Sequence, residues 1–387
     1  MQSEVQPWRL TIYSPLGVRR GWIAAPAQLS ATLRANAVSI VTVTVPTSHP
    51  HVSHLLEPGA RVVVEHDVAW DAPETGPDWR HVLSGPVRSR QGHGPQASAT
   101  VTVTVADDYR LLSRVLAWPV PTAPIDAQTS THDVLTGPAE TVAKTLVQRN
   151  AVDRLGLPVT VEPTQGRGPT ITVAARMTSL ADVIGTALTD AGLTMHVKQV
   201  INGGALHLAV SVQQRRTHTR PLTEESGAVR AWQYALSEPE ATRVIVGGPG
   251  EGVERTFLQV IDIAREVEHA DLIEAFRDAT DATTVSLLAA RGAQTLAETA
   301  PTSGLSLELA DTPGLRPLRD IAVGDRVTVD VGGQRITDTL TEIRVKWDAS
   351  SGTTTTPVVG GWSGSPQRAL TNILGRLART VARQQRR

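Results

Sequence analysis

Histidine is the residue type in this sequence best suited to hold a metal ion, and three histidines lie close together. His49, His51 and His54 are spaced at i, i+2 and i+5. Imidazole is a good ligand for zinc or nickel. The first carboxylate nearby belongs to Glu57, and Pro50 prevents one regular helix from aligning the three rings. We therefore interpret the segment as a turn between strands and predict no metal site.

A glycine-rich segment, Gly247-Gly248-Pro249-Gly250-Glu251-Gly252, follows a predicted strand, as a phosphate-binding loop does. Such a loop needs a Lys-Ser/Thr pair to reach the phosphates and magnesium, but Val253-Glu254 stands at that position. A dinucleotide site also needs a helix next, whereas 256–263 has the pattern of another strand. We interpret the segment as a glycine-built turn and predict no cofactor.

Neighbouring carboxylates are the remaining candidates for catalysis, because paired acids perform general acid–base chemistry when a cleft shifts their pKa values. One pair is Asp107-Asp108, at the end of a predicted strand, and the other is Asp278 with Asp281. We expect Asp281 to cap a helix, so structural roles account for these residues. The sequence contains neither a Gly-x-Ser-x-Gly elbow nor a cysteine. We predict that the chain is not an enzyme.

The composition favours a β-rich globular protein. Forty percent of the 387 residues are hydrophobic, but only two are Phe and three are Tyr. Valine, leucine, isoleucine and alanine must therefore fill the core, and valine favours strands. The net charge of −1 argues against a nucleic-acid-binding surface. Arginine greatly outnumbers lysine, which suits subunit interfaces, although a GC-rich coding bias is the simpler explanation.

The eight tryptophans carry most of the aromatic surface. Tryptophan and arginine dominate the binding energy of many interfaces, so exposed members of this set are candidate contacts, while others must belong to the core. The N-terminus lacks the apolar stretch of a signal peptide, and no run approaches 18 apolar residues. We expect a protein made and folded in a cytoplasm.

Residues 8–110 show the period of two that is typical of strands. Several short segments alternate between apolar and polar residues, and Thr100–Val105 alternates strictly. Turns rich in glycine and proline separate these segments, and no helical pattern lies between them. The region is therefore predicted to be a small barrel or sandwich.

The middle of the chain changes to a mixed pattern. A helix is predicted to begin near Pro138, and a second one has Ser179 as its N-cap, Asp182 in the capping-box position and Gly192 after its end. Asn202-Gly203-Gly204 is a strong hairpin turn. Further strands are expected near 228–236, 242–247 and 254–263, with a helix near 281–299.

The strand pattern returns after Pro301 and contains a weak internal repeat. Gly59-Ala-Arg-Val-Val-Val64 is similar to Gly324-Asp-Arg-Val-Thr-Val329. Each segment is followed by an apolar-Arg step, Val87-Arg88 or Ile343-Arg344, and then by a Thr-rich strand. The matching order predicts two barrels of one design, with chance similarity of strands as the alternative.

The last segment has the pattern of a basic amphipathic helix. Ser365 can cap it, and its apolar residues recur at helical spacing. Six arginines are not offset by any acid. A partner protein, self-association or an anionic surface could receive such a helix, and the alternative is docking on its own domain. We expect it to dock on another protein or on an acidic groove of a neighbouring subunit. The candidate interface residues are Leu370, Ile373, Leu374, Leu377, Val381, Arg376 and Arg383.

Four segments together resemble the tail-hub, or baseplate-hub, minor tail proteins of long-tailed bacteriophages, especially those of actinobacterial siphophages. Each motif is weak alone, and their order over about residues 5–362 carries the resemblance. Pro249 replaces a more usual polar residue of the family, so no role is transferred to it. The segments are Leu55-Leu56-Glu57-Pro58-Gly59-Ala60-Arg61-Val62, Asp107-Asp108-Tyr109-Arg110-Leu111-Leu112, Val246–Gly252 with Arg255, and Val323-Gly324-Asp325-Arg326-Val327.

The resemblance implies a trimeric ring in the tail tip, in which two barrels per subunit alternate as six similar units and dock on a six-fold tail. It implies contacts with the distal tail protein and tail tube proteins on one side, and with a downstream minor tail or fibre protein on the other. The tape-measure protein and the genomic DNA would pass through the channel. The location implied is the virion, without a membrane anchor.

The expected fold class is mainly β with an α+β insertion. We predict an N-terminal β-barrel domain over 1–110, a central α+β domain over 111–302, a C-terminal β-barrel domain over 303–364 and the basic helix over 365–387. Two other functions stay open on sequence alone: a tail-associated cell-wall hydrolase that uses an Asp or Glu pair, and a carbohydrate-binding β-module.

Overall fold

A computed structural model describes residues 7–24, 26–69, 76–95, 98–227, 229–309 and 317–360. They form two compact units, and the first contains the chain up to Trp232 together with Leu307–Val359. The second unit is built on Gln233–Ser306. The four-part division expected from the sequence is a finer partition and stays a prediction. In the described part of the chain, none of the helices has the length and hydropathy of a membrane span.

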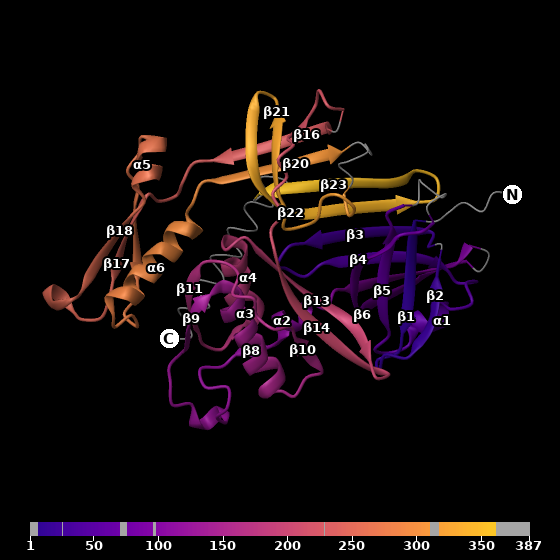
Figure 1. The fold of residues 1–387 in the computed structure, drawn as a ribbon, viewed down its shortest axis with the longest axis horizontal. Coiled ribbons are helices and arrows are strands. Elements are labelled where there is room, and N and C mark those ends of the chain that lie inside the picture. Colours follow the sequence, from indigo (N-terminus) through magenta and orange to yellow (C-terminus); the bar gives the residue numbers. More distant parts are fainter. Residues whose placement is uncertain are drawn as a thin grey trace. The chain divides into compact units, whose positions relative to one another are not determined.

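One continuous sheet is the framework of the first unit, and its central strand order is β23-β22-β3-β4-β7-β6-β5-β1-β2 (Figure 1). The strands assigned from sequence to two barrels are thus joined through the pairing of β22 with β3. The short strand β15 extends the sheet beside β21, and β16 and β20 carry the chain into and out of the second unit. The bounds are β1 Trp8–Tyr13, β2 Arg19–Ile23, β3 Gln28–Arg34, β4 Ile40–Pro46, β5 Arg61–Asp67, β6 Trp79–His93, β7 Thr100–Ala106, β15 Leu222–Thr223, β16 Val229–Ser237, β20 Thr302–Leu309, β21 Arg326–Val331, β22 Gln334–Asp348 and β23 Gly352–Gly360.

Alternation along β4 and β7 explains how these strands are held. Their valines are buried on one face, while their threonines form a ladder on the other. The hydroxyls of Thr44 and Thr102 lie 3.0 Å apart and share a hydrogen bond, and Thr42 and Thr104 form a second pair. Cross-strand pairs of this kind stabilise a half-buried sheet.

The two segments of the internal repeat occupy topologically equivalent places. Strands β5, β6 and β7 form one antiparallel meander, and β21, β22 and β23 form another. In each meander the middle strand has 15 residues, pairs with one neighbour along its first half and with the next along its second half. The main-chain N–H of Val87 donates to Ala60 at the changeover in β6, and that of Leu340 donates to Asp325 at the changeover in β22.

The equivalence corrects one detail of the sequence alignment. Because Val87 and Leu340 occupy the same place in their meanders, the Ile343-Arg344 step lies three residues beyond the position expected from Val87-Arg88. The strand order was predicted correctly, whereas this pairwise register was wrong, since alternating strands repeat every two residues and align in several ways.

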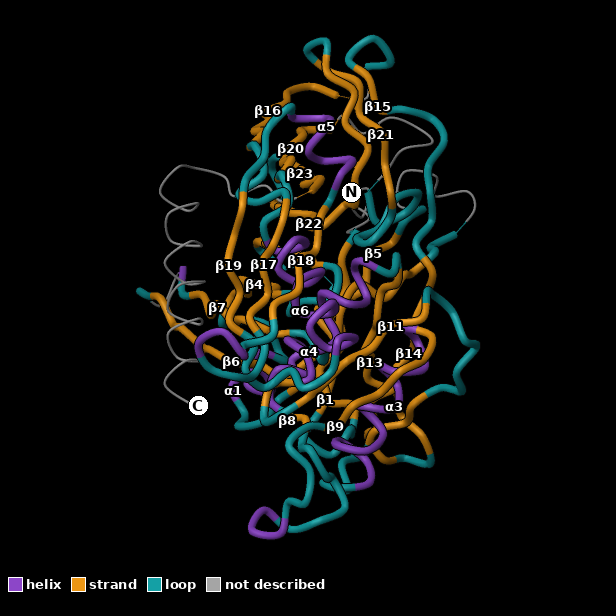
Figure 2. The backbone as a smooth tube through the Cα atoms, turned by 90° about the vertical axis from the view of Figure 1, so that its left-hand side faces the viewer, coloured by secondary structure: helices purple, strands orange, loops and turns teal. Residues whose placement is uncertain are grey.

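An α+β insertion follows β7 in the first unit. Its core contains helices α3 and α4, packed with the long hairpin of β13 and β14 (Figure 2). Ser179 caps α4 by accepting a hydrogen bond from the Asp182 N–H at 3.1 Å, as predicted. The elements of the first unit outside the large sheet are α1 Val52–Leu56, α2 Arg110–Arg114, β8 Leu116–Ala117, the short helix Ile125–Ala127, β9 Asp133–Pro138, α3 Ala139–Val147, the π-helical turn Gln148–Asp153, β10 Val159–Val161, β11 Thr170–Ala175, β12 Thr178–Ser179, α4 Leu180–Asp190, β13 Leu193–Asn202 and β14 Ala205–Gln214.

The second unit is a three-stranded sheet with two helices. The strand order is β18-β17-β19, with β18 antiparallel and β19 parallel to the central β17. Helix α6 packs on β17 and β18 and buries Leu288 against Val244 and Val246. The elements are β17 Arg243–Gly247, the short helix Gly252–Glu254, β18 Phe257–Ile261, α5 Ile263–His269, β19 Glu274–Asp278 and α6 Val285–Glu298.

The fold is mainly β with an α+β insertion, as predicted from the sequence. Two local expectations were wrong. The cap of α6 is Thr284, whose hydroxyl accepts from the Leu287 N–H, whereas Asp281 lies before the cap and pairs with Arg291. The histidine segment is not only a turn, because the short helix α1 begins two residues after Pro50.

Candidate functional site

The interface residues predicted from the sequence, Leu370, Ile373, Leu374, Leu377, Val381, Arg376 and Arg383, lie outside the described residues. The tryptophans divide as expected for a mixture of core and surface positions. Trp8 and Trp347 are buried, whereas Trp22 and Trp232 are exposed. The structure therefore offers exposed aromatic surface in the first unit.

The three histidines of the 49–54 segment are close in space, but their contacts indicate a local structural role. The His51 ring lies 5.8 Å from that of His49 and 6.0 Å from that of His54. Nδ1 of His54 lies 2.7 Å from Oε1 of Glu57, and this contact lowers the pKa of the Glu57 carboxyl. Among the described residues no group of His, Cys, Asp or Glu has the geometry to hold a metal ion.

A buried polar network joins the N-terminal strands to β13 within the first unit. Arg61 donates through Nη2 to Oδ1 of Asp108 at 2.5 Å, and the Ser84 hydroxyl donates to the other carboxylate oxygen at 2.7 Å. The Gln199 N–H donates to the same Ser84 hydroxyl, and Arg61 Nε donates to the Gln199 side chain. The network links polar side chains from four segments, so it fixes how the α+β insertion sits on the sheet.

A second polar junction reinforces this arrangement. Asn36 lies in the turn between β3 and β4 with a φ of +51°, a conformation that asparagine tolerates. Its side chain donates to the Thr189 hydroxyl and to the Leu193 carbonyl, and it accepts from the Met195 N–H at 2.9 Å. Both junctions were missed from the sequence, because many of the partners are more than 100 residues apart in the chain.

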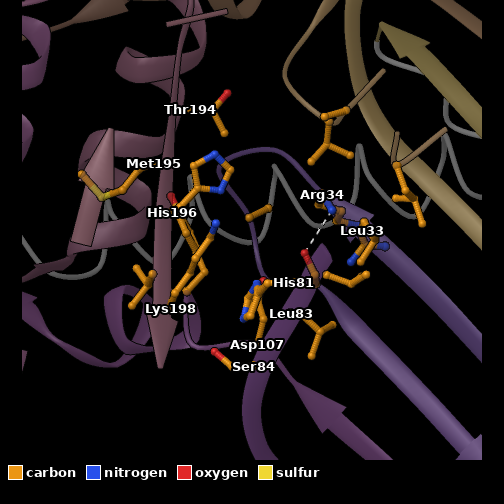
Figure 3. A pocket seen from close by; sticks show the side chains of 18 of the residues that line it. Leu33, Arg34, His81, Leu83, Ser84, Asp107, Thr194, Met195, His196 and Lys198 are labelled. Atoms are coloured by element: carbon orange, nitrogen blue, oxygen red, sulfur yellow. Dashed lines mark hydrogen bonds between the residues drawn. The ribbon is translucent and has the colours of Figure 1, made fainter. Parts of the chain in front are cut away.

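A small pocket of about 170 Å³ lies beside this junction. His196 and Lys198 from β13 face His81 and Leu83 from β6 across it (Figure 3). Burial lowers the pKa of His81 and of His196 to about 4, and the positive charge of Lys198 contributes to both shifts. These imidazoles are therefore neutral at neutral pH. Drug-sized ligand sites usually enclose about 300–1,000 Å³, so this pocket is smaller than a typical ligand site.

Two further titratable groups line the pocket. Burial lowers the pKa of His66 to about 4, and Asp67 opposes that shift. Burial raises the pKa of Asp107 to about 7, while hydrogen bonds from Ser39 oppose the shift. Among the described residues both ring nitrogens of His66 and Oδ1 of Asp107 are buried without a hydrogen-bond partner. The pocket thus brings together several titratable side chains whose pKa values are shifted by burial.

Arg255 explains the glycine-rich turn of the second unit. Its guanidinium donates to the carbonyls of Gly247 and Gly248, both at 3.1 Å, and it pairs with Asp278. A side chain at Gly247 would collide with this guanidinium and with Phe276. A single short helical turn, Gly252–Glu254, and then strand β18 follow the glycine-rich segment, so the long helix of a dinucleotide-binding unit does not follow it in the described chain.

Solved phage tail proteins share the fold over nearly the whole chain. A 43 kDa tail protein of prophage MuSo2 from Shewanella oneidensis is 13% identical, with 91% of this chain and 98% of that chain covered and a TM-score of 0.55. A tail protein from Neisseria meningitidis MC58 is 12% identical, with 92% and 97% covered and a TM-score of 0.53. Prophage tail protein gp18 from Listeria monocytogenes EGD-e is 10% identical, with 96% and 99% covered and a TM-score of 0.53.

These structures show that the fold of this chain is one that occurs in tail proteins. A family model for the Siphovirus ReqiPepy6 Gp37-like protein matches residues 9–361, and the chain belongs to that family. No curated protein sequence matches this chain. The resemblance to siphophage tail proteins inferred from the ordered motifs is confirmed, and the protein is a phage tail protein of siphovirus type.

Proposed function

We propose that this protein is the structural hub of the tail tip, that three copies form a ring, and that it is not an enzyme. The ring links the end of the six-fold tail tube and the distal tail protein to the downstream minor tail or fibre proteins. It lines the channel through which the tape-measure protein and genomic DNA pass. Assembly takes place in the host cytoplasm.

The observation that supports this proposal most directly is the equivalence of the two meanders. One meander joins the β3–β4 hairpin through β7, and the other joins it through β22. A subunit with two equivalent β units can present six similar surfaces when three copies surround an axis. A ring of three such subunits would match a six-fold tube without six copies of the chain.

The carboxylates give little support to a hydrolase. Asp108 is saturated by Arg61 and Ser84, which leaves it without access to a substrate. Asp107 lines a pocket of about 170 Å³, which is small for a glycan or peptide chain. Asp281 pairs with Arg291.

The proposal is tested by the mass of the untagged full chain in solution, together with a cell-wall digestion assay. We expect a stable trimer of about 124 kDa, three times the 41.3 kDa chain, without lytic activity. A lytic monomer would establish the cell-wall hydrolase instead. A non-lytic monomer that binds cell-wall glycans would establish the carbohydrate-binding module.

Location provides an independent test. Antibody labelling of intact virions should mark the tail tip, and a tail tube fragment should retain the protein through gel filtration. The matched control carries Asp107→Asn, which removes a candidate acid but leaves the meanders intact. We expect this variant to assemble like the wild type. Labelling along the tube or on the capsid would contradict the hub.

A further inference from the structure

The sheet of the second unit has one covered face and one open face. Helix α6 covers the face that carries Val244 and Val246, both fully buried (Figure 1). The alternate residues of the same strands point to the other face, because side chains alternate along a strand. Among residues 233–306, no described helix packs over the centre of that second face.

The open face carries the two phenylalanines of the whole chain. Phe257 on β18 is 55% exposed, and Phe276 on β19 is 58% exposed. They pair with Gly247 and Ile245 of β17, which places both on the same face. The Arg255 guanidinium carbon lies 5.6 Å from the centre of each ring, so the two rings flank one cation. Two exposed phenylalanines on one small face indicate a binding surface.

The strand topology independently favours a second element that covers the open face. Strands β17 and β19 are parallel, and parallel strands usually have both of their faces buried. The central strand is apolar toward both sides, since Ile245 lies between Val244 and Val246. A helix on the open face would complete the three-layer arrangement in which a sheet lies between helices.

The charge of the second unit indicates what kind of helix fits. Residues 233–306 contain twelve acidic residues, five arginines and no lysine, an excess of seven negative charges. Four of the five arginines already form ion pairs within the unit: Arg243, Arg255, Arg265 and Arg291. A cationic partner is therefore favoured.

The chain itself contains a segment with the matching properties. Residues 366–387 contain six arginines and no acid, and their apolar residues recur at helical spacing from Leu370 to Val381. At about 1.5 Å per residue, this stripe extends about 16 Å along a helix. A five-residue strand extends about 17 Å, at roughly 3.3 Å per residue. The apolar stripe and the open face thus agree in length and are opposite in charge.

We propose that residues 366–387 bind as a helix across the open face of the β18-β17-β19 sheet of the same chain. The apolar stripe of this helix packs on the rings of Phe257 and Phe276. The stripe residues that make this contact are Ile373, Leu374 and Leu377. The arginines of the segment face the acidic residues of the second unit. This intramolecular cover differs from the expectation, drawn from the sequence, that the helix docks on another protein or a neighbouring subunit.

The absence of cysteine from the chain makes a direct test possible. Gln259 is exposed and pairs with Ile245, so it lies on the open face without being one of the two rings. The full-length double variant Gln259→Cys with Leu370→Cys is oxidised, and its products are separated on a denaturing gel without reductant. We expect an intramolecular disulfide in most of the protein. The matched control pairs Gln259→Cys with Asn372→Cys, on the opposite side of the helix, and should link at least fivefold less.

Linkage only between two chains would overturn the proposal in favour of docking between copies. Equal linkage of both cysteine pairs would also overturn it, because the segment would then meet the sheet without a defined face.

Hydrogen exchange of the full chain gives a second readout. Backbone amides of residues 368–384 should exchange at least tenfold more slowly than in an unstructured peptide. Leu377→Ser, which changes no residue of the sheet, should remove that protection, and so should Phe276→Ser. The control Leu16→Ser, at an exposed position of the first unit, should leave it unchanged. Unprotected amides in the wild type, or protection that survives both variants, would contradict the proposal.

Discussion

Gly59 and Gly324 occupy the same position in the two meanders of this protein. Their φ angles are +73° and +93°, and each glycine lies two residues before the arginine that opens the first strand of its meander. The left-handed conformation disfavours any residue with a Cβ atom. The sequence similarity between the segments thus reflects a shared backbone requirement.

Alanine at either glycine should destabilise the first unit. A Cβ at Gly59 would lie 2.7 Å from Pro15 Cγ, and one at Gly324 would collide with the Thr194 side chain. Left-handed strain alone costs roughly 1–2 kcal/mol, and the collisions add to it. Gly333→Ala is the control, since its φ is +75° but its surroundings are open. Chemical denaturation should rank both variants below this control, and equal losses would show that the contacts are irrelevant.

Removal of the Asp108 carboxylate should be among the costliest single changes at the polar junction. Asp108→Ala leaves the nearly buried Arg61 guanidinium without its partner, which typically costs about 3–5 kcal/mol. The exposed pair of Asp330 with Arg335 provides the comparison, and Asp330→Ala should cost roughly 0–1 kcal/mol. Denaturant titration measures the free energy of unfolding of both variants, and Asp108→Ala should lose more of it than Asp330→Ala. Similar losses for both variants would contradict a structural role for the network.

Stability should decline as the pH falls from about 6.5 toward 4. Burial lowers the pKa of His66, His81 and His196 to about 4 in the folded protein, so the unfolded chain takes up protons first over this range. Asp107 acts in the opposite direction. Its pKa is raised to about 7, so below that pH the folded protein binds this proton first and gains stability. Three histidines outweigh one carboxyl, so the net effect is destabilisation by acid.

A variant separates the histidine contribution from general acid denaturation. His81→Gln should flatten the fall in melting temperature between pH 6.5 and 4, whereas His93→Gln, at an exposed position at the end of β6, should not. Melting curves across this pH range provide the measurement. An unchanged slope in His81→Gln would show that the pocket does not control the acid response.

The cap of α4 provides a smaller, local prediction. Ser179→Ala removes the hydroxyl that accepts from the Asp182 N–H and should cost about 1 kcal/mol. The neighbouring Thr178→Ala is a matched control, because the Thr178 hydroxyl donates to the Arg176 carbonyl and does not cap the helix. The denaturant midpoint of Ser179→Ala should be lower than that of Thr178→Ala. Identical midpoints would show that the cap does not contribute to the stability of the first unit.

Elements with a clear capping or turn residue at one end could be predicted from the sequence. The cap at Ser179 and the turn at Asn202-Gly203-Gly204 are dictated by neighbouring residues, and both elements were predicted correctly. Strand β19 and helix α5 were missed, because Glu274–Asp278 is short and half charged and α5 leaves Ile263 and Val267 exposed. Without a buried face, neither element has the periodicity that sequence reasoning uses.

The candidate sites were harder to predict than the elements. Arg61 and Asp108 are visible in the sequence as charged residues among apolar ones, but nothing local joins them to Ser84 or Gln199. The pocket likewise depends on His81 and His196 meeting from strands 115 positions apart. Such sites follow from tertiary packing, which single-sequence patterns do not encode.

The long strands β6 and β22 have a mechanical consequence. Strand β6 pairs with two neighbours along its 15 residues and β22 pairs with three, so a pull along either strand loads all of its ladders in shear. In shear, many hydrogen bonds must yield together, whereas a pull across the strand breaks them one at a time. Each copy of this chain should therefore be stiff against tension along these two strands and weak against tension applied across them.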